Sequence, residues 1–349
     1  MPVALAPTPL APLRTRHLTA LSDVAPDEFA RLLTTAALIK GDPAPYRREL
    51  DGRSVILLFE KDSLRTRCSF EVGVNRLGGH AMYMDHSKSR IGERESIADY
   101  ARNLDRFFAA IVARVYSHST IVGLAKHSSV PVVNALCDQH HPCQALADFL
   151  TLRERFVVAG KRGARSGAHD GSPGASGDAD LRRIKLAYIG DVNNVAHSLL
   201  HAAALAGATL TLVAPPGCGN SPSSVAILRE AQQIASRTGA TIRLTDDPGA
   251  VAGHHAVYTD TWFSMGYEPT AAESRAARLE LFAPYQVNRA LMAKAGPDAI
   301  FMHCLPAHRG EEVTDDVIDS PNSAVYDQAE NRLHAQNALM VHLVPGSGR

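Results

Sequence analysis

The sequence contains few cysteines, and none of them are closely spaced. Its five cysteines are odd in number, widely scattered and without a Cys-x-x-Cys pair: Cys68, Cys137, Cys143, Cys218 and Cys304. Disulfide scaffolds and structural zinc sites are both built from such pairs, so the sequence argues against either class. Unpaired thiols are typical of a reducing compartment, and we expect a cytoplasmic protein.

An excess of charge of one sign and long apolar runs are also missing. Lys and Arg number 36, as do Asp and Glu, so no overall field favours nucleic acid or an anionic membrane. No apolar run approaches the roughly 20 residues of a membrane span. The first residues contain repeated prolines without the apolar block of a secretion signal, and we expect residues 1–15 to be a loose tail. We therefore expect neither nucleic acid nor a membrane as a partner.

The length and composition are those of a globular protein with two domains. The chain has 349 residues, of which 45% are apolar and 21% charged. Apolar runs of strand length alternate with helical patterns through both halves, which is typical of βα units on a parallel sheet. The sequence therefore predicts an α/β fold with two domains, each a mainly parallel sheet flanked by helices.

The expected elements follow this alternation. The expected strands are Val55–Phe59, Ala81–Met84, Ala110–Ala113, Val130–Asn134, Ile184–Ile189, Leu210–Val213, Ile242–Leu244, Ala256–Thr259 and Ala299–His303. The expected helices are Thr66–Leu77, Ser96–Phe108, Thr120–His127, His141–Phe156, Asn194–Ala206, Pro222–Ser236 and Gln328–Leu343. Between the halves, a stretch rich in Gly and Ser has too little apolar surface to form a core, and we interpret residues 157–182 as a linker or insertion.

The turn Ser63–Arg67 carries two arginines and two hydroxyls between a strand and a helix. A helix start already attracts anions, and guanidinium forks suit phosphate. For an isolated arginine, a surface pair with Glu60, Asp62 or Glu71 would be the better interpretation. Two arginines with two hydroxyls at the carboxyl end of a strand instead favour a phosphate site, although the glycines of a Walker loop are absent.

Two later turns also follow expected strands. Pro142 fixes a helix start, so we expect His141 to point into the same cleft, with a helix cap or a surface position as the alternative. No acidic residue or cysteine completes a ligand spacing with His140 and His141, which argues against zinc. The turn Gly190–Val195 holds a single glycine, which disfavours a dinucleotide, whereas the amide of Asn194 suits a zwitterionic substrate.

Two segments near the end of the chain combine polar groups. Asp260–Gly266 offers a carboxylate and a hydroxyl, which indicates a receptor for an amino group; the alternative is a surface helix cap that holds Trp262 in the core. His303 and Cys304 are adjacent at a strand end, where neighbouring side chains point to opposite faces. We therefore do not expect His303 to activate Cys304, which would line the site without attacking.

Taken together, several segments resemble the aspartate/ornithine carbamoyltransferases, and within them the ornithine-specific members. These segments, in the order of the family, are Phe59–Arg67, Ala113–Tyr116, His141–Gln144, Gly190–Asn194, Asp260–Gly266, His303–Pro306 and Glu330–Arg332. The resemblance implies transfer of the carbamoyl group of carbamoyl phosphate to the δ-amino group of L-ornithine, giving L-citrulline and phosphate in arginine biosynthesis, or the reverse. It also implies no metal or organic cofactor, and a homotrimer whose sites lie between subunits.

The resemblance assigns the parts of the chain as well. Residues 16–156 would be the carbamoyl-phosphate domain and residues 183–327 the ornithine domain, with 328–349 a helix that returns to the first. The residues implied for carbamoyl phosphate are Ser63, Leu64, Arg65, Thr66, Arg114, His141, Gln144, Cys304, Leu305 and Arg332, with Arg90 reaching in from a neighbouring subunit. Those implied for ornithine are Asn194, Asp260, Ser264 and Met265. Arg114 and His141 would polarise the carbonyl, and Asp260 and Cys304 would assist the attacking amine.

Leu64 departs from the family pattern, because it replaces a residue with a hydroxyl while keeping the backbone donor. This substitution leaves open a non-catalytic homologue that binds carbamoyl phosphate. An enzyme for an acylated ornithine is a second alternative, although Asp260 suits a free α-amino group. An aspartate-specific relative would need cations that Thr261–Glu268 does not supply, and an oxidoreductase would need the missing glycines.

Overall fold

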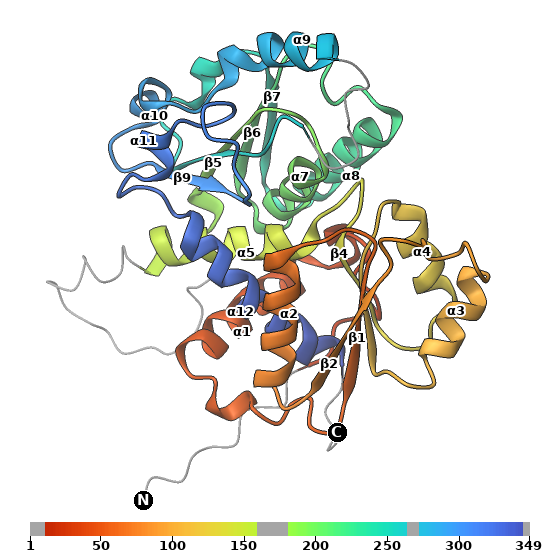
Figure 1. The fold of residues 1–349 in the computed structure, drawn as a ribbon. Coiled ribbons are helices and arrows are strands. Elements are labelled where there is room, and N and C mark those ends of the chain that lie inside the picture. Colours follow the sequence, from red (N-terminus) through yellow and green to blue (C-terminus); the bar gives the residue numbers. More distant parts are fainter. Residues whose placement is uncertain (1–10, 159–180, 264–271, 345–349) are drawn as a thin grey trace, which may run out of the picture. The chain divides into compact units, whose positions relative to one another are not determined.

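The computed structural model describes residues 11–158, 181–263 and 272–344, which form two units (Figure 1). Unit 1 runs to Leu146 and resumes at Arg332, and unit 2 comprises Ala147–Asn331. The boundary therefore falls within two helices, α5 (Pro142–Leu152) and α12 (Val325–Leu343). Residues 1–10 of the expected tail and residues 159–180 of the expected linker lie outside the described residues.

Unit 1 is built on a parallel sheet with the strand order β2-β1-β3-β4. Its strands are β1 (Ser54–Phe59), β2 (His80–Asp85), β3 (Ala110–Arg114) and β4 (Val132–Leu136). Leu57 of β1 lies opposite Tyr83 on one side and Val112 on the other. The inner strands are buried on both faces, which explains their unbroken apolar sequences, whereas the edge strand β2 alternates between exposed and half-buried residues.

Helices cover this sheet. Those of unit 1 are α1 (Pro26–Gly41), α2 (Leu64–Arg76), α3 (Ile97–Leu104) and α4 (His118–His127), with the start of α5 and the end of α12. Helix α2 begins where it does because the Ser63 hydroxyl accepts a hydrogen bond from the Thr66 backbone N–H at 3.3 Å. Gly73 of α2 allows α12 to approach closely, since a Cβ there would lie 2.2 Å from Asn337 Oδ1.

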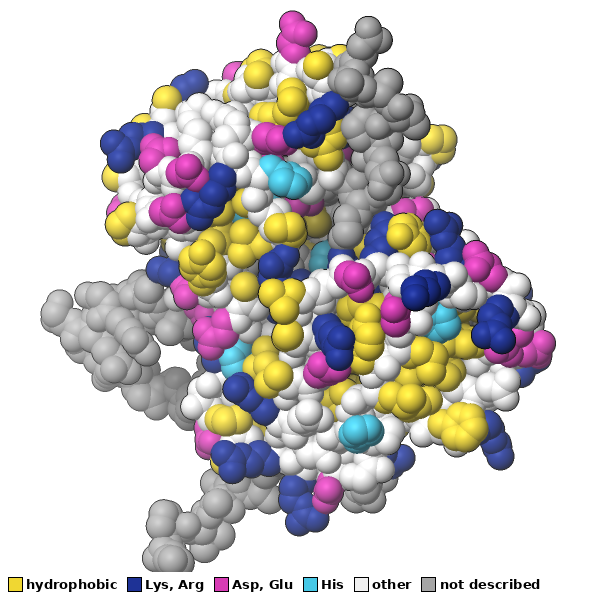
Figure 2. All heavy atoms as spheres, viewed as in Figure 1, with side chains coloured by type: hydrophobic (Ala, Val, Ile, Leu, Met, Phe, Trp, Pro, Cys, Tyr) yellow, Lys and Arg dark blue, Asp and Glu magenta, His cyan; other side chains and the backbone are white. Residues whose placement is uncertain are grey.

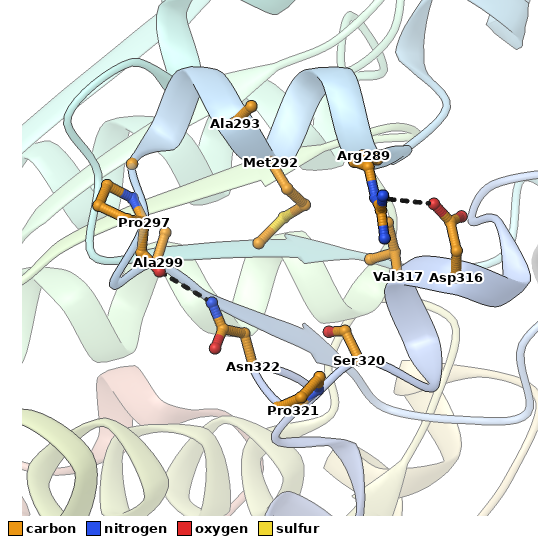
Figure 3. A pocket seen from close by; sticks show the side chains of 11 residues that line it. Arg289, Met292, Ala293, Pro297, Ala299, Asp316, Val317, Ser320, Pro321 and Asn322 are labelled. Carbon is orange, nitrogen blue, oxygen red and sulfur yellow. Dashed lines mark hydrogen bonds and ion pairs between the residues drawn. The ribbon is translucent and has the colours of Figure 1, made fainter.

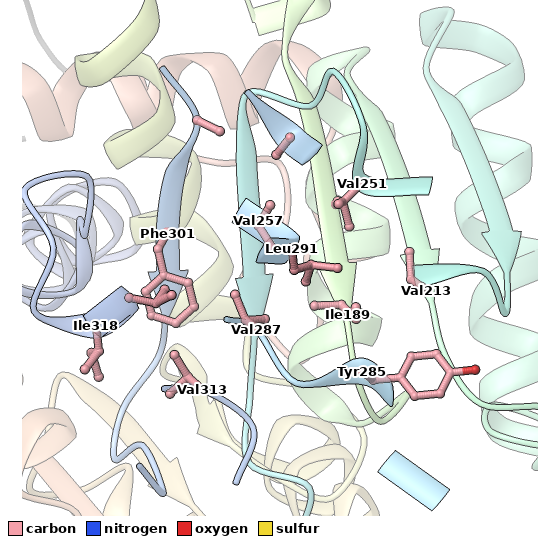
Figure 4. Packing of buried hydrophobic residues seen from close by; sticks show 14 of the residues in the cluster. Ile189, Val213, Val251, Val257, Tyr285, Val287, Leu291, Phe301, Val313 and Ile318 are labelled. Atoms are coloured by element: carbon pink, nitrogen blue, oxygen red, sulfur yellow. The ribbon is translucent and has the colours of Figure 1, made fainter. Parts of the chain in front are cut away.

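Unit 2 is built on a second parallel sheet, with the order β7-β6-β5-β8-β9. Its strands are β5 (Lys185–Ile189), β6 (Thr209–Val213), β7 (Thr241–Thr245), β8 (Ala256–Thr259) and β9 (Ile300–His303). Its helices are α7 (Asn194–Ala206), α8 (Pro222–Thr238), α9 (Ala272–Phe282), α10 (Arg289–Ala295) and α11 (Asp315–Ile318). A buried cluster that includes Val257, Leu291 and Phe301 joins the sheet to α10 (Figure 4).

The predicted fold class is confirmed: each unit is a parallel sheet flanked by helices. Every expected strand and helix is present, with shifts of a few residues at the ends. The expected helix His141–Phe156, for example, is α-helical to Leu152 and then continues as a π-helical turn, Arg153–Val158. Helices α1, α9, α10 and α11 were not predicted.

The described surface carries mixed charge. On the face shown in Figure 2, cationic and acidic side chains are interspersed and neither sign forms a continuous patch. Within residues 11–158, 181–263 and 272–344, none of the helices has the length and apolar character that crossing a bilayer requires.

Candidate functional site

In unit 1, polar residues gather where parallel strands end and helices begin. Strand β1 ends four residues before Ser63, β3 ends at Arg114, and α5 begins directly after His141. Carboxyl ends of parallel strands lie at one edge of a sheet, which is where open α/β sheets bind ligands. We call Ser63, Thr66, Arg114, His141, Gln144 and Arg332 the anion cluster.

The hydroxyl of Thr66 is the centre of the anion cluster. Thr66 is fully buried, and its Oγ1 lies 3.4 Å from Arg114 Nη1 and 3.0 Å from Arg332 Nη2, which both donate to it. The Ser63 hydroxyl donates to the same oxygen at 3.0 Å. Arg332 also donates to Gln144 Oε1 at 2.9 Å. Two buried guanidinium groups are thus held side by side, which makes this edge strongly electropositive and suited to a phosphate.

His141 is neutral in this surrounding. It is buried, and burial is the main reason that its pKa is held well below the usual 6.5. The positive charges of Arg332, Arg114 and Arg65 lower this pKa further. A neutral imidazole can donate one ring N–H to a ligand without adding a further charge to the cluster.

The two arginines of the Ser63–Arg67 turn differ. Arg67 is exposed, lies 3.2 Å from Glu71 Oε1 and stacks over the Tyr83 ring at 4.0 Å. The interpretation as a surface ion pair therefore describes Arg67. Arg65, in contrast, is half-buried and near enough to His141 to lower the pKa of that histidine. Leu64, the residue expected to carry a hydroxyl in the family pattern, is 73% exposed. The leucine at this position therefore leaves the buried donors of the anion cluster in place.

Sequence reasoning missed Lys61 in the same segment. Lys61 is buried, and its pKa is lowered first by burial and next by Arg114. Its ammonium lies 4.3 Å from the centre of the Tyr116 ring, and the Arg90 guanidinium lies at the same distance from that ring. A lysine two residues after an apolar strand was the signal in the sequence that could have found it.

The loop that carries Arg90 is tied to the end of β3. One carboxylate oxygen of buried Glu60 accepts from the Ile91 N–H at 2.9 Å, and the other accepts from the Tyr116 N–H at 2.8 Å. Arg90 thus lies against Tyr116 of its own chain, where it also lines a cavity of about 410 Å³. Its predicted reach into a neighbouring subunit stays a prediction.

In unit 2, a second group forms at the ends of β5, β8 and β9. Asp260 is buried, with its Oδ2 accepting from Asn193 Nδ2 at 2.7 Å and its Oδ1 accepting from Cys304 Sγ at 3.0 Å. We call these three residues the carboxylate cluster. The Cys304 thiol is the donor in this contact. Because Asp260 is buried, it is not the surface helix cap of the alternative interpretation. Trp262 is buried, as that alternative required.

His303 serves a different partner. Its Nε2 lies 3.1 Å from Glu312 Oε1, and its Nδ1 accepts from the Leu305 backbone N–H at 2.8 Å. These contacts support the expectation that His303 does not activate Cys304, which stays a prediction. Leu305 has a φ of 59°, in the left-handed region, and its bond to His303 helps to hold it there.

The remaining predicted ornithine residues are placed in part. Asn194 is half-buried and is the first residue of α7. The preceding residue, Asn193, makes the bond to Asp260, and sequence reasoning missed it because both asparagines stand in the same turn. Ser264 and Met265 lie outside the described residues. The structure thus brings together the anion cluster within unit 1 and, separately, the carboxylate cluster within unit 2, to which Leu305 is adjacent.

Two groups of described residues have spacings that a metal ion would accept. They are Asp260 with His303 and Cys304, and His308 with Glu311 and Glu312, each with ligand atoms within 4.8 Å of one another. In the first group, both oxygens of Asp260 and both ring nitrogens of His303 already have hydrogen-bond partners. We interpret the first group as a hydrogen-bonded network, and the absence of a metal from the reaction stays a prediction.

A cavity of about 290 Å³ lies elsewhere in unit 2, beside α10 and α11 (Figure 3). Arg289 and Asp316 point toward each other at its rim, 3.5 Å apart, and Met292 lines it between Arg289 and Pro297. None of the predicted site residues lines this cavity. The reaction is therefore not assigned to it.

Known proteins resemble this chain over nearly its whole length. The model for the carbamoyl-P binding domain of aspartate/ornithine carbamoyltransferase matches residues 16–154, and the model for the Asp/Orn binding domain of the same family matches residues 182–343. An ornithine carbamoyltransferase of Shewanella oneidensis is 49% identical over 328 residues, which cover 94% of this chain and 99% of that protein. One of Pyrococcus abyssi is 44% identical over 340 residues, covering 96% and 97%.

Solved structures agree with these matches. The ornithine carbamoyltransferase of Pyrococcus furiosus has a TM-score of 0.82 and 43% identity, covering 98% of this chain and 99% of that one. The anabolic ornithine carbamoyltransferase of Campylobacter jejuni has a TM-score of 0.80 at 30% identity, covering 94% and 99%. Sequence, fold and the residues at the strand ends lead to one conclusion: this chain belongs to the aspartate/ornithine carbamoyltransferase family.

Proposed function

We propose that this chain transfers the carbamoyl group of carbamoyl phosphate to the δ-amino group of L-ornithine, giving L-citrulline and phosphate. The observation that carries the proposal is the convergence of Arg114 and Arg332 on the Thr66 hydroxyl. Relatives that are up to 49% identical are named ornithine carbamoyltransferases, which supports ornithine as the acceptor.

The phosphate end of the substrate would bind to the first turn of α2. Backbone N–H groups at a helix start and the side chains of Ser63 and Arg65 offer donors to its oxygens. Leu64 would contribute only its backbone N–H there, since its side chain is exposed. As the C–O bond to phosphate breaks, the charge that gathers on the leaving group is stabilised by Arg65 and its neighbours.

The carbamoyl end would meet the deeper residues of the anion cluster. Arg114, Thr66 and neutral His141 donate to the carbonyl oxygen and stabilise the negative charge that develops there during attack. Donors fixed in advance in this way are commonly worth roughly 3–4 kcal/mol each when removed. Gln144, Cys304, Leu305 and Arg332 would hold the remaining atoms of the carbamoyl group.

Ornithine would bind to the carboxylate cluster. We assign its α-ammonium group to Asp260 with Ser264, and its α-carboxylate to Asn194 and the Met265 backbone. The δ-ammonium group gives one proton to solvent before it attacks, and Asp260 and Cys304 orient the resulting amine. As the N–C bond forms and the C–O bond breaks, the second proton of the attacking nitrogen leaves with the phosphate. An acylated ornithine carries no α-ammonium charge for the buried carboxylate of Asp260, which makes that alternative the weaker one.

Three further assignments belong to the proposal. Residues 16–156 would form the carbamoyl-phosphate domain and residues 183–327 the ornithine domain, with the segment 328–349 completing the first. The active assembly would be a homotrimer in which Arg90 reaches the site of a neighbour. The odd number and wide scatter of the five cysteines support a cytoplasmic location.

A citrulline assay on the purified chain tests the proposal. We expect a colorimetric citrulline signal with carbamoyl phosphate and L-ornithine, and none with N-acetylornithine. Turnover of the acylated substrate alone would reject the proposal, and so would binding of carbamoyl phosphate without turnover of either.

The turn itself supplies a matched pair of variants. Arg65→Ala should abolish most of the signal, whereas Arg67→Ala, two residues away and paired with Glu71 on the surface, should keep it. Equal losses in the two variants would contradict the assignment of Arg65 to the phosphate.

A further inference from the structure

We infer that Asn193 is a positioning residue. It fixes the orientation in which the Asp260 carboxylate binds the α-ammonium group of ornithine. This inference rests on the proposed function. Asn193 itself would not touch the reacting atoms. It would act through Asp260, whose Oδ2 it holds at 2.7 Å.

The orientation of the Asn193 side chain is fixed by its other contacts. Its Oδ1 accepts from the backbone N–H of Val195 at 2.9 Å and of Ala196 at 3.2 Å, both in the first turn of α7. A backbone N–H can only donate, so the amide oxygen must face the helix. The Tyr188 hydroxyl lies 3.3 Å from the same oxygen. The amide nitrogen is therefore the atom that faces Asp260, and it can only donate.

The support behind Asn193 is rigid. Asn193 is 8% exposed and is the cap of α7, a helix whose residues from Val195 to Leu205 are all buried. Its side chain thus connects the first turn of this helix to the residue that follows β8. The position of the Asp260 carboxylate is set by the helix start as well as by its own strand.

Both bonds to Asp260 come from uncharged groups. Asn193 Nδ2 and Cys304 Sγ are neutral donors, one on each carboxylate oxygen. Among the residues that the structure describes, no cationic side chain forms an ion pair with Asp260. A carboxylate that is oriented but not neutralised is suited to an ammonium group of a ligand.

Two substitutions separate this role from helix capping. Asn193→Asp has nearly the same shape and keeps an oxygen that can cap α7, but it places a second carboxylate where the amide donated. Two carboxylates at this distance repel or share one proton, and either outcome spoils the receptor. Asn193→Ser keeps a capping hydroxyl and removes the donor without adding charge.

The test compares the full-length wild type with these two variants. We expect Asn193→Asp to raise the KM for ornithine at least tenfold and Asn193→Ser to raise it less. The KM for carbamoyl phosphate should stay within about twofold in both variants. The melting temperature should change little in Asn193→Ser, whereas the buried pair of carboxylates lowers it in Asn193→Asp. The acid limb of the rate profile should move to higher pH in Asn193→Asp only, since only that variant adds a titratable group.

Binding of L-ornithine, measured by calorimetry in the presence of carbamoyl phosphate or inorganic phosphate, distinguishes failure of this inference from failure of the proposed function. Weaker ornithine binding in Asn193→Asp than in the wild type supports the inference, whether or not citrulline forms. Absence of citrulline would overturn only the proposed function. Wild-type ornithine affinity and KM in Asn193→Asp would overturn the inference. A parallel rise of both KM values with a lower melting temperature would also overturn it, since that is the signature of a purely structural residue.

Discussion

The guanidinium of Arg332 donates a hydrogen bond to the Thr66 hydroxyl over 3.0 Å, although 266 positions separate the two residues in the chain. The last long helix, α12, therefore supplies one wall of a cluster that begins at the end of β1. Arg332 also donates to Gln144, so its planar fork addresses two acceptors at fixed angles.

This fork leads to the first prediction. Arg332→Lys keeps the positive charge but cannot reach both Thr66 and Gln144 with one planar group. Losing a hydrogen bond made by a charged group costs roughly 1.5–3 kcal/mol, so the KM for carbamoyl phosphate should rise about 10- to 100-fold. Steady-state kinetics measure this. Arg102→Lys, at an exposed pair with Asp99, is the matched control and should behave as the wild type.

Cys304 provides the second prediction. Because its thiol donates to Asp260, a hydroxyl can replace it, whereas a nucleophile could not be replaced so simply. We expect Cys304→Ser to keep at least about a tenth of the wild-type kcat and Cys304→Ala to lose more, by the roughly 1–3 kcal/mol of a missing donor. A covalent adduct on Cys304 during turnover, seen by mass spectrometry, would contradict this.

The third prediction concerns pH and His141. Its pKa in the folded protein lies well below 6.5, so the unfolded chain binds a proton more readily as the pH falls. Stability is therefore lost as the pH drops below about 6.5, by at most ~1.4 kcal/mol per pH unit from this group. His141→Gln should show a shallower loss than the wild type.

Urea unfolding of both proteins between pH 7.5 and 5.5 measures the difference. Other histidines with lowered pKa values, such as His118 and His254, are present in both proteins and cancel in the comparison. Equal slopes in the two proteins would mean that His141 is not held neutral by its surroundings.

The fourth prediction tests the close approach of α2 and α12. Gly73→Ala would place a Cβ 2.2 Å from Asn337 Oδ1, and Asn337 is too buried to move away freely. We expect a loss of about 1–3 kcal/mol in the free energy of unfolding, measured with denaturant. Gly41→Ala, at the last residue of α1 with open space around it, should change stability by less than about 1 kcal/mol.

The alternation of apolar runs predicted both sheets because parallel strands buried on two faces leave an unbroken apolar signal, as in β1 and β3. Helices α10 and α11 were missed because they are short, so that too few turns exist to reveal a period. Helix α1, in contrast, carries an apolar stripe at helical spacing, so its sequence does contain a helical signal.

The sequence predicted which strand ends carry the residues of the site. Motif positions indicated that Thr66, Arg114 and His141 share one edge, but not that Thr66 is the shared acceptor, because this depends on side-chain direction in three dimensions. The same limit explains why the sequence indicated Asn194 rather than Asn193. Only the cap geometry of α7 shows which of two adjacent amides turns toward Asp260.

The two oxygens of Glu60 have a consequence for local opening. Ile91 and Tyr116 donate to the two oxygens of one buried carboxylate, so detaching the loop around Arg90 would expose Glu60 while it still holds the residue after β3. The amide protons of these two residues should therefore exchange with solvent as one cooperative unit, at similar protection. Glu60 thus links the loop around Arg90 to the residues that follow β3.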